Sequence, residues 1–460
     1  MAKNEYFKNY ETYVRDNEAP HNYHVWTSIS VLSALLGRKC YVPQGLFTVY
    51  PNLYVILVGS PGLKKSTAMN VGKNLLRTVE GIPTSPEATT REALINSLAK
   101  NKVTYKLGEK QMFYHQSTAF VTEMSEFLGA KHTNAPLINF LTTIWDENEF
   151  RWDTRRDGEV KIESPYFSLL GCTNPDWIST GLKSDVITGG FSRRMIFVSE
   201  RAPSTKNPWP VLSEEQEEAF LKVSMAAQRI SKLQGNFVLT EGAMELWVDE
   251  YNKADKALSS KDPRLQYYYS SKHNLVLKVA ICLAGAFETG RTIPRALLDL
   301  TFKIFEQTER NLEEVFSGVG RNELKPILDK VHKCIVEEGS IKYRKLIGRF
   351  YNEVNKPELE EIVTTLASMG LVDVDRSASV LNYVLRATSK AKPQAQANLW
   401  KLISRAWPEV EAETAASSGA PEPPRQLDPE VKKRLARLEQ RQREIQAGVL
   451  LKGKDRQARG

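Results

Sequence analysis

The chain has few cysteines, few histidines and no long apolar run, and each shortage excludes a class of protein. Its 460 residues include four cysteines and six histidines. The cysteines stand far apart and the histidines show no ligand spacing, which argues against a disulfide framework and against a structural metal site. The longest apolar stretches, such as residues 276–287, are too short to span a bilayer, and early charges interrupt any secretory leader. We therefore expect a cytoplasmic protein with no membrane partner.

Net charge is also scarce over most of the chain. The formal net charge is +8, but the stretch from Arg425 to the end holds eleven Lys/Arg and five Asp/Glu, which leaves +6 in this tail alone. The remaining body is close to neutral. The basic tail either contacts polyanions or only keeps the protein in solution.

Composition and periodicity divide the chain into five segments. Alternating strand and helix patterns predict an α/β fold with a parallel sheet, of the P-loop NTPase kind, followed by helices and a small winged-helix-like module. The tail includes a charged helix at 429–445. The expected segments are a helical lead-in (1–50), an ATPase core (51–210), a helical lid (211–320), the winged-helix-like module (321–390), and a linker with the basic tail (391–460).

The residues "GSPGLKKS", 59–66, fit the phosphate-binding pattern G-x-x-x-x-G-K-[ST] except at Lys64, where the pattern has glycine. An apolar strand pattern precedes them and a helical pattern follows, which is the context that the motif requires. Backbone N–H groups of such a loop bind phosphates, while the lysine reaches the β- and γ-phosphates and the hydroxyl binds Mg²⁺. The alternative is an ordinary Gly-Pro turn with incidental lysines. The residues expected to bind ATP and Mg²⁺ are Gly59, Gly62, Lys64, Lys65, Ser66 and Thr67.

A second apolar run, "AFV", ends at Thr122 and Glu123. An NTPase needs a carboxylate to activate water, and we expect Glu123 to provide it from the strand beside the phosphate-loop strand. Thr122 occupies the usual aspartate position and would hold Mg²⁺ with less negative charge, unless Glu126 reaches back. The alternative is a strand that ends in an ordinary capping acid.

Two further polar sites flank apolar runs. Asn174 follows "SLLGCT" and can orient the attacking water against a γ-phosphate. Arg193 and Arg194 precede the run "MIFV", and an arginine placed there can reach the γ-phosphate of a neighbouring subunit. The alternative for the arginines is a surface pair.

In this order, "GSPGLKKST", "FVTEMSEF", "LLGCTNP" and "GFSRRMIF" resemble the Walker A, Walker B, sensor 1 and arginine-finger motifs of AAA+ ATPases. The last two are similar to those of minichromosome-maintenance and superfamily 3 helicases. Residues 20 to about 310 resemble most closely the helicase-like ATPase domain of phage and mobile-element primase-helicases, on "HVWTSISVLSALLGRK", "YPNLYVILVGSPG" and "TEMSEFLG". The resemblance implies that Asn174 is sensor 1, Arg193 the finger and Lys278 a sensor 2.

The residues "FRWDTRRDGEVKIESP" read as a β-hairpin with an Asp-Gly turn. In the helicases just named, a hairpin at this place projects into the pore of the ring. Arg155, Arg156 and Lys161 would then contact the DNA backbone, and Trp152 would stack on a base. An edge hairpin with solvated arginines is the other interpretation.

The winged-helix-like module gives a mixed signal. Its third helix begins at Pro357 with Glu358, Glu360 and Glu361, which would repel phosphates, whereas its second helix is basic. The module therefore binds DNA unconventionally, binds a protein, or packs against the ATPase.

These features lead to three hypotheses. The first is an ATP-driven DNA translocase or helicase, a ring homo-oligomer (expected to be a hexamer) that acts on single-stranded or forked DNA in replication of a phage or mobile element in a bacterial host, with a primase or polymerase as a further partner. The second is a non-motor initiator, helicase loader or regulator. The third is a metabolic P-loop kinase, which is disfavoured because such an enzyme needs neither an interface arginine nor a winged helix.

Overall fold

The structure is a computed structural model of the chain. It describes residues 6–87, 89–128, 135–154, 158–181, 190–257, 265–315, 324–375, 384–387 and 398–417. The chain divides into two compact units, Met1–Thr414 and Ala415–Gly460. The helix predicted at 429–445 lies outside the described residues. Over the residues that are described, no helix is both long enough and apolar enough to cross a membrane.

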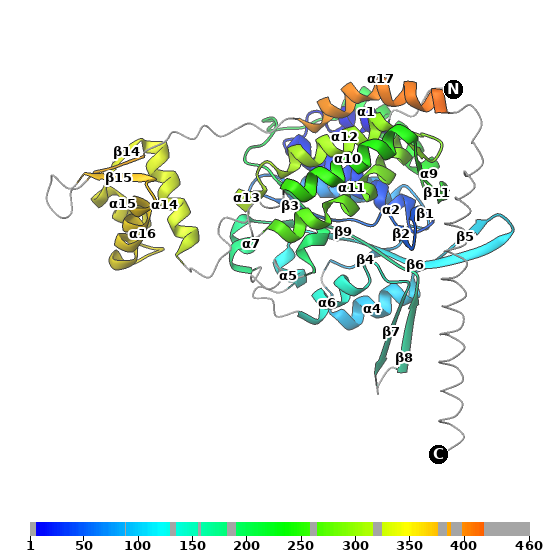
Figure 1. The fold of residues 1–460 in the computed structure, drawn as a ribbon, viewed down its shortest axis with the longest axis horizontal. Helices are drawn as coiled ribbons and strands as arrows, with labels where there is room; N and C mark the ends of the chain where they lie inside the picture. The colour runs from blue at the N-terminus through cyan, green and yellow to red at the C-terminus, as the bar shows by residue number, and fades with distance from the viewer. Residues whose placement is uncertain are drawn as a thin grey trace, which may run out of the picture. The chain divides into compact units, whose positions relative to one another are not determined.

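A six-stranded sheet forms the centre of the first unit. Its strands are β3 (Tyr54–Val58), β4 (Thr84–Ser85), β5 (Lys102–Leu107), β6 (Lys110–Val121), β9 (Pro165–Thr173) and β10 (Met195–Ser199). Their order across the sheet is β10-β3-β9-β6-β4, all parallel, and β5 pairs antiparallel with the first half of β6. The mixed α/β class with a parallel sheet is therefore confirmed (Figure 1).

The central strands are apolar because both faces of the sheet are covered. Every residue of β3 and of β9 is buried, as is typical of parallel strands between two layers of helices. In β6 the burial begins at Tyr114, where the strand passes from its antiparallel pairing with β5 to its parallel pairing with β9.

Helices pack on both the sheet and one another. They are α1 (Tyr6–Val14), α2 (His21–Leu36), α3 (Lys65–Arg77), α4 (Arg91–Lys100), α5 (Met124–Leu128), α6 (Ala135–Thr143), α7 (Pro175–Gly181), α9 (Glu214–Ile230), α10 (Glu241–Ala257), α11 (Gln266–Ala286), α12 (Arg295–Glu309) and α13 (Leu312–Val315). Fifteen of the 16 residues of α2 are buried, because this helix packs against α3, α11 and β9 at once. Helices α10, α11 and α12 pack side by side (Figure 1).

Short strands complete this unit. They are β1 (Cys40–Gln44), β2 (Phe47–Val49), β7 (Glu149–Thr154), β8 (Gly158–Glu163), β11 (Gly235–Asn236), β12 (Val238–Leu239) and β13 (Thr292–Ile293). The pairs β1–β2 and β7–β8 are antiparallel hairpins, and the second is the hairpin that the sequence predicts. Strands β11, β12 and β13 add small parallel pairs that connect the later helices to β1 and to each other.

Residues 324–387 have a hydrophobic cluster of their own, built around Val331, Leu346 and Leu366. Their elements are α14 (Lys325–Glu338), β14 (Ser340–Lys342), α15 (Tyr343–Phe350), α16 (Lys356–Ser368), β15 (Val372–Asp375) and β16 (Val384–Ala387). The expected order of three helices and two antiparallel strands is present, and β14 adds a third strand to the sheet.

The expectation that residues 391–460 are linker and tail is wrong for part of that segment. Residues Leu399–Ser417 form helix α17. Trp400 is buried in the main hydrophobic cluster, and Trp407 stacks on Phe287 with ring centroids 4.5 Å apart. The apolar residues ahead of the Ala- and Ser-rich stretch therefore belong to the core, and the composition of that stretch masked them.

Helix α4 begins with a threonine cap. The cap is Thr90, whose hydroxyl accepts a hydrogen bond from the backbone N–H of Ala93 at 3.3 Å. The hydroxyl of the adjacent Thr89 donates to the carbonyl of Thr90.

Candidate functional site

The phosphate-loop pattern lies where it was predicted, between β3 and α3. Gly59 follows the last residue of β3, and its N–H donates to the carbonyl of Thr173 at the end of β9. A side chain at Gly59 has no room, because a Cβ there would come within 2.4 Å of the Tyr23 hydroxyl and 2.7 Å of Leu63. The loop is therefore tightly packed against α2 on its inner side, while Gly62, with φ of 89°, has open space around it.

Lys64, the residue that departs from the pattern, has the left-handed backbone conformation that glycine usually provides there. Its φ is 56° and its ψ is 29°. Its amine lies 3.3 Å from the carboxylate of Glu18. The lysine thus fits the loop, at the energetic cost that a side chain bears in this conformation.

Lys65, Ser66 and Thr67 form the first turn of α3, whose leading N–H groups have no partner inside the helix. The Lys65 amine donates to the carbonyls of Gly59 at 2.5 Å and Ser60 at 3.1 Å. Burial lowers the pKa of this amine, and the charge of Glu123 opposes that shift. The side chains of Ser66 and Thr67 are exposed. No acid lies in this turn, so the donor set fits an anionic phosphate chain.

Glu123 follows β6, but the expectation that this strand lies directly beside β3 is wrong. Strand β9 lies between the two. The Glu123 carboxylate accepts a hydrogen bond from the Ser125 hydroxyl at 3.1 Å, and it is close enough for its charge to raise the pKa of Lys65. The carboxyl ends of β3, β9 and β6 thus bring the loop and the acid together.

Thr122 is exposed, and its hydroxyl donates to the carboxylate of Glu87 at 3.0 Å. Glu87, and not Glu126, is therefore the acid that reaches Thr122; Glu126 is exposed on the first turn of α5. The sequence analysis missed Glu87 because β4, which precedes it, has only two residues. The one available signal was an acid shortly after a Pro-Thr-Ser segment.

Asn174 stands at the carboxyl end of β9, directly beside the phosphate loop. Its side-chain oxygen accepts a hydrogen bond from the N–H of Trp177 at 2.7 Å and so caps α7. The cap uses the oxygen only, which leaves the amide N–H groups as donors. The water-orienting role of Asn174 stays a prediction.

Arg193 and Arg194 lie at the other end of the sheet. They precede β10, whose first residue pairs with Tyr54 at the start of β3. The five residues of β3 separate that end from the phosphate loop by about 13 Å. Arg194 is structural, since its guanidinium contacts the carbonyl of Gly190 and the carboxylate of Asp146, 3.2 Å away. Within the described part of the chain, the Arg193 guanidinium has no such partner.

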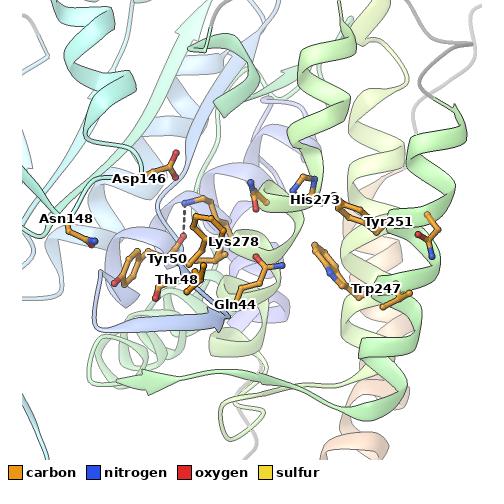
Figure 2. Close-up of a pocket in the computed structure, with 15 residues that line it drawn as sticks. Gln44, Thr48, Tyr50, Asp146, Asn148, Trp247, Tyr251, His273 and Lys278 are labelled. Atoms are coloured by element: carbon orange, nitrogen blue, oxygen red, sulfur yellow. Dashed lines mark hydrogen bonds between the residues drawn. The ribbon is translucent and has the colours of Figure 1, made fainter. Parts of the chain in front are cut away.

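The structure does not bring Lys278 to the phosphate loop. Its amine donates to the carbonyl of Tyr50 at 3.0 Å (Figure 2). It donates to Asn52 at 2.7 Å as well, and both partners precede β3. It also lies 4.3 Å from the centre of the Trp145 ring. Burial lowers its pKa to about 7. The sensor 2 interpretation is therefore corrected: Lys278 stabilises the chain segment that enters β3.

Lys278 lines a cavity of about 880 Å³ between the β1–β2 hairpin and helices α10 and α11. Figure 2 shows the side chains that line it. Trp247, Tyr251 and His273 line its other side, and both Trp247 and Tyr251 make edge contacts with the His273 ring. The cavity opens beside Asp146, at the same end of the sheet as the arginine pair and away from the phosphate loop.

In the described part of the β7–β8 hairpin, the basic side chain predicted to contact DNA is paired with acids of the same hairpin. Arg155 and Arg156 lie outside the described residues. The Lys161 amine is 2.5 Å from Glu163 and 3.0 Å from Glu149, so both neighbours neutralise it. The ring of Trp152 is covered by the guanidinium of Arg91 at 5.5 Å. Residues 149–163 carry four basic and five acidic side chains in all.

A buried polar group behind the phosphate loop also escaped the sequence analysis. The Tyr23 hydroxyl donates to the carbonyl of Val58 at 2.6 Å, and the Asn22 amide donates to the carboxyl of Glu200 at 2.6 Å. Burial raises the pKa of Glu200 to about 7. Residues from α2 and from the end of β10 therefore support the loop from inside. Only the alternation of polar residues in the mostly apolar α2 hinted at this.

Among the described residues, no three or more His, Cys, Asp or Glu side chains are grouped so as to hold a metal ion. Searches with protein-family models and among curated proteins give no match to this chain.

Proposed function

We propose that the chain binds ATP with Mg²⁺ and hydrolyses it, with Gly59–Ser66 as the phosphate-binding loop. The observation that carries the proposal is the meeting of three strand ends. The carboxyl ends of β3, β9 and β6 bring together the loop, Asn174 and Glu123, and Glu123 acts electrostatically on Lys65. A parallel sheet uses this edge to bind ligands.

Each residue has a chemical role in this proposal. Backbone N–H groups of the loop and of the first turn of α3 hold the phosphates, and Lys65 leaves its loop carbonyls to bind them. Glu123 accepts a proton from the attacking water, and the free amide N–H groups of Asn174 orient that water. Ser66 and Thr122 are the residues that would hold Mg²⁺, which when bound would offset the negative charge that develops on the phosphates.

The placement of Arg193 supports action between subunits. Because it lies at the opposite end of the strands from its own phosphate loop, it can assist hydrolysis only at the loop of another copy. The proposal therefore includes a closed homo-oligomer, in which each subunit presents Arg193 to its neighbour. A hexameric ring is the form that the motif resemblance implies.

We further propose that hydrolysis drives translocation on single-stranded or forked DNA during replication of a phage or mobile element. The support is the order of motifs and the presence of a hairpin, β7–β8, between Glu123 and Asn174. A primase or polymerase is the partner that such a motor would serve.

The second candidate is a non-motor switch, an initiator, loader or regulator that binds ATP. Two observations favour it. The described cations of the hairpin, Arg151 and Lys161, are paired with carboxylates of the same hairpin. The first turn of helix α16 holds Glu358, which closes a capping box with Asn355, and two more acids follow it. These acids weaken phosphate binding by the module.

Nucleotide binding tests the shared core of both candidates. We expect the purified chain to bind ATP with Mg²⁺, and Lys65→Ala to lose that binding while it remains folded. Lys100→Ala, an exposed lysine on α4, is the matched control and should bind as the native chain does. No binding of ATP by the native chain in the presence of Mg²⁺ would contradict the proposal.

Strand displacement separates the two candidates. A motor unwinds a tailed duplex with ATP, shows DNA-stimulated hydrolysis, and loses both with Lys65→Ala. A switch binds ATP and hydrolyses it slowly, without unwinding. Phosphoryl transfer to a nucleoside in place of water would instead support a metabolic kinase.

A further inference from the structure

Glu87 lies where two elements of the proposed site meet. It follows β4, which pairs in parallel with β6 so that Ser85 is opposite Ala119. This register brings Glu87 level with the end of β6. One carboxylate oxygen accepts from the Thr122 hydroxyl at 3.0 Å, and the other is 2.6 Å from the amine of Lys73 on α3. Both oxygens are thus fixed in direction.

The hydrogen bond determines what Thr122 can offer to anything else. A hydroxyl has one proton and two lone pairs. The Thr122 proton is committed to Glu87, so the exposed oxygen presents lone pairs only. A carboxylate behind a hydroxyl strengthens that oxygen as an acceptor, because hydrogen bonds in a chain polarise one another. The pair thus behaves as a carboxylate whose charge is relayed through a hydroxyl.

Glu87 and Lys65 of the phosphate loop act electrostatically on the same side chain, that of Cys172. Cys172 is buried on β9, between β3 and β6. Burial is the main cause of the raised pKa of its thiol; Lys65 then lowers that pKa, and Glu123 and Glu87 raise it. The three charges therefore surround the end of one strand. Lys73 offsets part of the negative charge of Glu87. It lies about two turns of α3 after Lys65, and so at a different place on the helix from the lysine proposed to bind phosphate.

We propose that Glu87, acting through the Thr122 hydroxyl, supplies the negative charge that an aspartate at position 122 would supply, and is a positioning residue for the Mg²⁺ of the nucleotide. This inference rests on the proposed binding of ATP with Mg²⁺. It explains how a site with threonine at the metal position retains a divalent cation. The outer partner of a metal ligand typically controls metal affinity by 10- to 100-fold.

The test measures metal dependence directly. Binding of a fluorescent ATP analogue is titrated with Mg²⁺ for the native chain, for Glu87→Gln, for Glu87→Gln combined with Thr122→Asp, and for Glu80→Gln. Glu80→Gln makes the same chemical change at an exposed glutamate seven residues earlier. Binding without divalent cation is measured in EDTA, and thermal unfolding reports on the fold of each variant.

We expect Glu87→Gln to raise the Mg²⁺ concentration at half-saturation by about 10- to 100-fold, with unchanged binding in EDTA. Thr122→Asp should return the midpoint close to the native value, because it places the missing charge directly on the ligand. Glu80→Gln should leave the midpoint unchanged. A purely structural role of Glu87 would lower the unfolding temperature without moving the Mg²⁺ midpoint.

Two outcomes overturn the inference while the proposed function stands: a Glu87→Gln titration that superimposes on that of Glu80→Gln, or a shifted midpoint that Thr122→Asp does not correct. If the native chain itself shows no Mg²⁺-dependent binding of ATP, the proposed function fails first and this inference falls with it. The native titration therefore separates the two failures.

Discussion

The left-handed backbone conformation of Lys64 predicts which of two variants at this position is the more stable. The direction of that difference depends on the backbone conformation alone. Replacing Lys64 by alanine or by glycine removes the same ion pair with Glu18, so the comparison of the two variants cancels that contact. At φ of 56° a residue with a Cβ bears a cost of about 1–2 kcal/mol that glycine avoids. Glycine in turn gains about 0.4–1 kcal/mol of conformational entropy in the unfolded chain. Lys64→Gly should therefore be more stable than Lys64→Ala by about 0.5–1 kcal/mol.

The opposite sign would follow if position 64 were an ordinary helical residue of α3. Glycine would then be less stable than alanine by about 1 kcal/mol. Urea unfolding followed by circular dichroism measures the difference as a shift in midpoint at constant slope. A glycine variant less stable than the alanine variant would refute the left-handed loop, and with it the fit of this sequence to a phosphate-binding turn. Both variants should still bind ATP with Mg²⁺, since the proposed phosphate ligand is Lys65.

Three further predictions concern charged groups. Arg193→Ala should lower the rate of ATP hydrolysis about 10³- to 10⁵-fold with little change in stability. Arg194→Ala should instead lower the unfolding temperature, because Arg194 binds Asp146 at the β10 end of the sheet. Oligomers that mix native and variant subunits distinguish the two, since only Arg193→Ala should cause a loss of hydrolysis in them. The pKa of Glu200 is raised from an ordinary 4.5 to about 7. Its contribution to the free energy of unfolding is therefore full below pH 4.5 and falls as pH rises to 7, by at most about 3 kcal/mol. Glu200→Gln should flatten this pH dependence, measured by urea unfolding at pH 5 and pH 8. The pKa of Lys278 is lowered from 10.5 to about 7. Between these two pH values the unfolded chain binds a proton that the folded chain does not, so the free energy of unfolding should rise with pH. Lys278→Met should abolish this rise, measured by unfolding at pH 7.5 and pH 9.5.

The sequence predicts those elements whose signals are local and strong. The run before Gly59 is apolar throughout and is followed by loop residues and a helical pattern, so β3, the loop and α3 were predicted in their correct order. The same holds for β9, which is buried throughout, and for β10, which is buried except at its last residue. Position 64 was identified as the departure from the motif, whereas its positive φ is seen only in the structure.

The remaining features depend on contacts between distant residues. Strand β4 has two residues and exists only because it pairs with β6, so no propensity could indicate Glu87 as a partner of Thr122. The order of the strands, with β9 between β3 and β6, follows from how the whole chain folds. Lys278 lies in an apolar helix where a buried structural lysine and a functional one have the same local pattern. Its partner Asn52 is 226 residues away.

Helix α17 has a consequence for the architecture of the chain. Val315 and Trp400 both belong to the main hydrophobic cluster, while the residues between them include a module with a cluster of its own. The module is thus tethered at two ends to one body, as an inserted domain is, and does not hang from a single flexible linker. A chain shortened at residue 390 would keep the module but strip the aromatic cover from Phe7 and Phe287. It would thereby expose an apolar patch around these two rings.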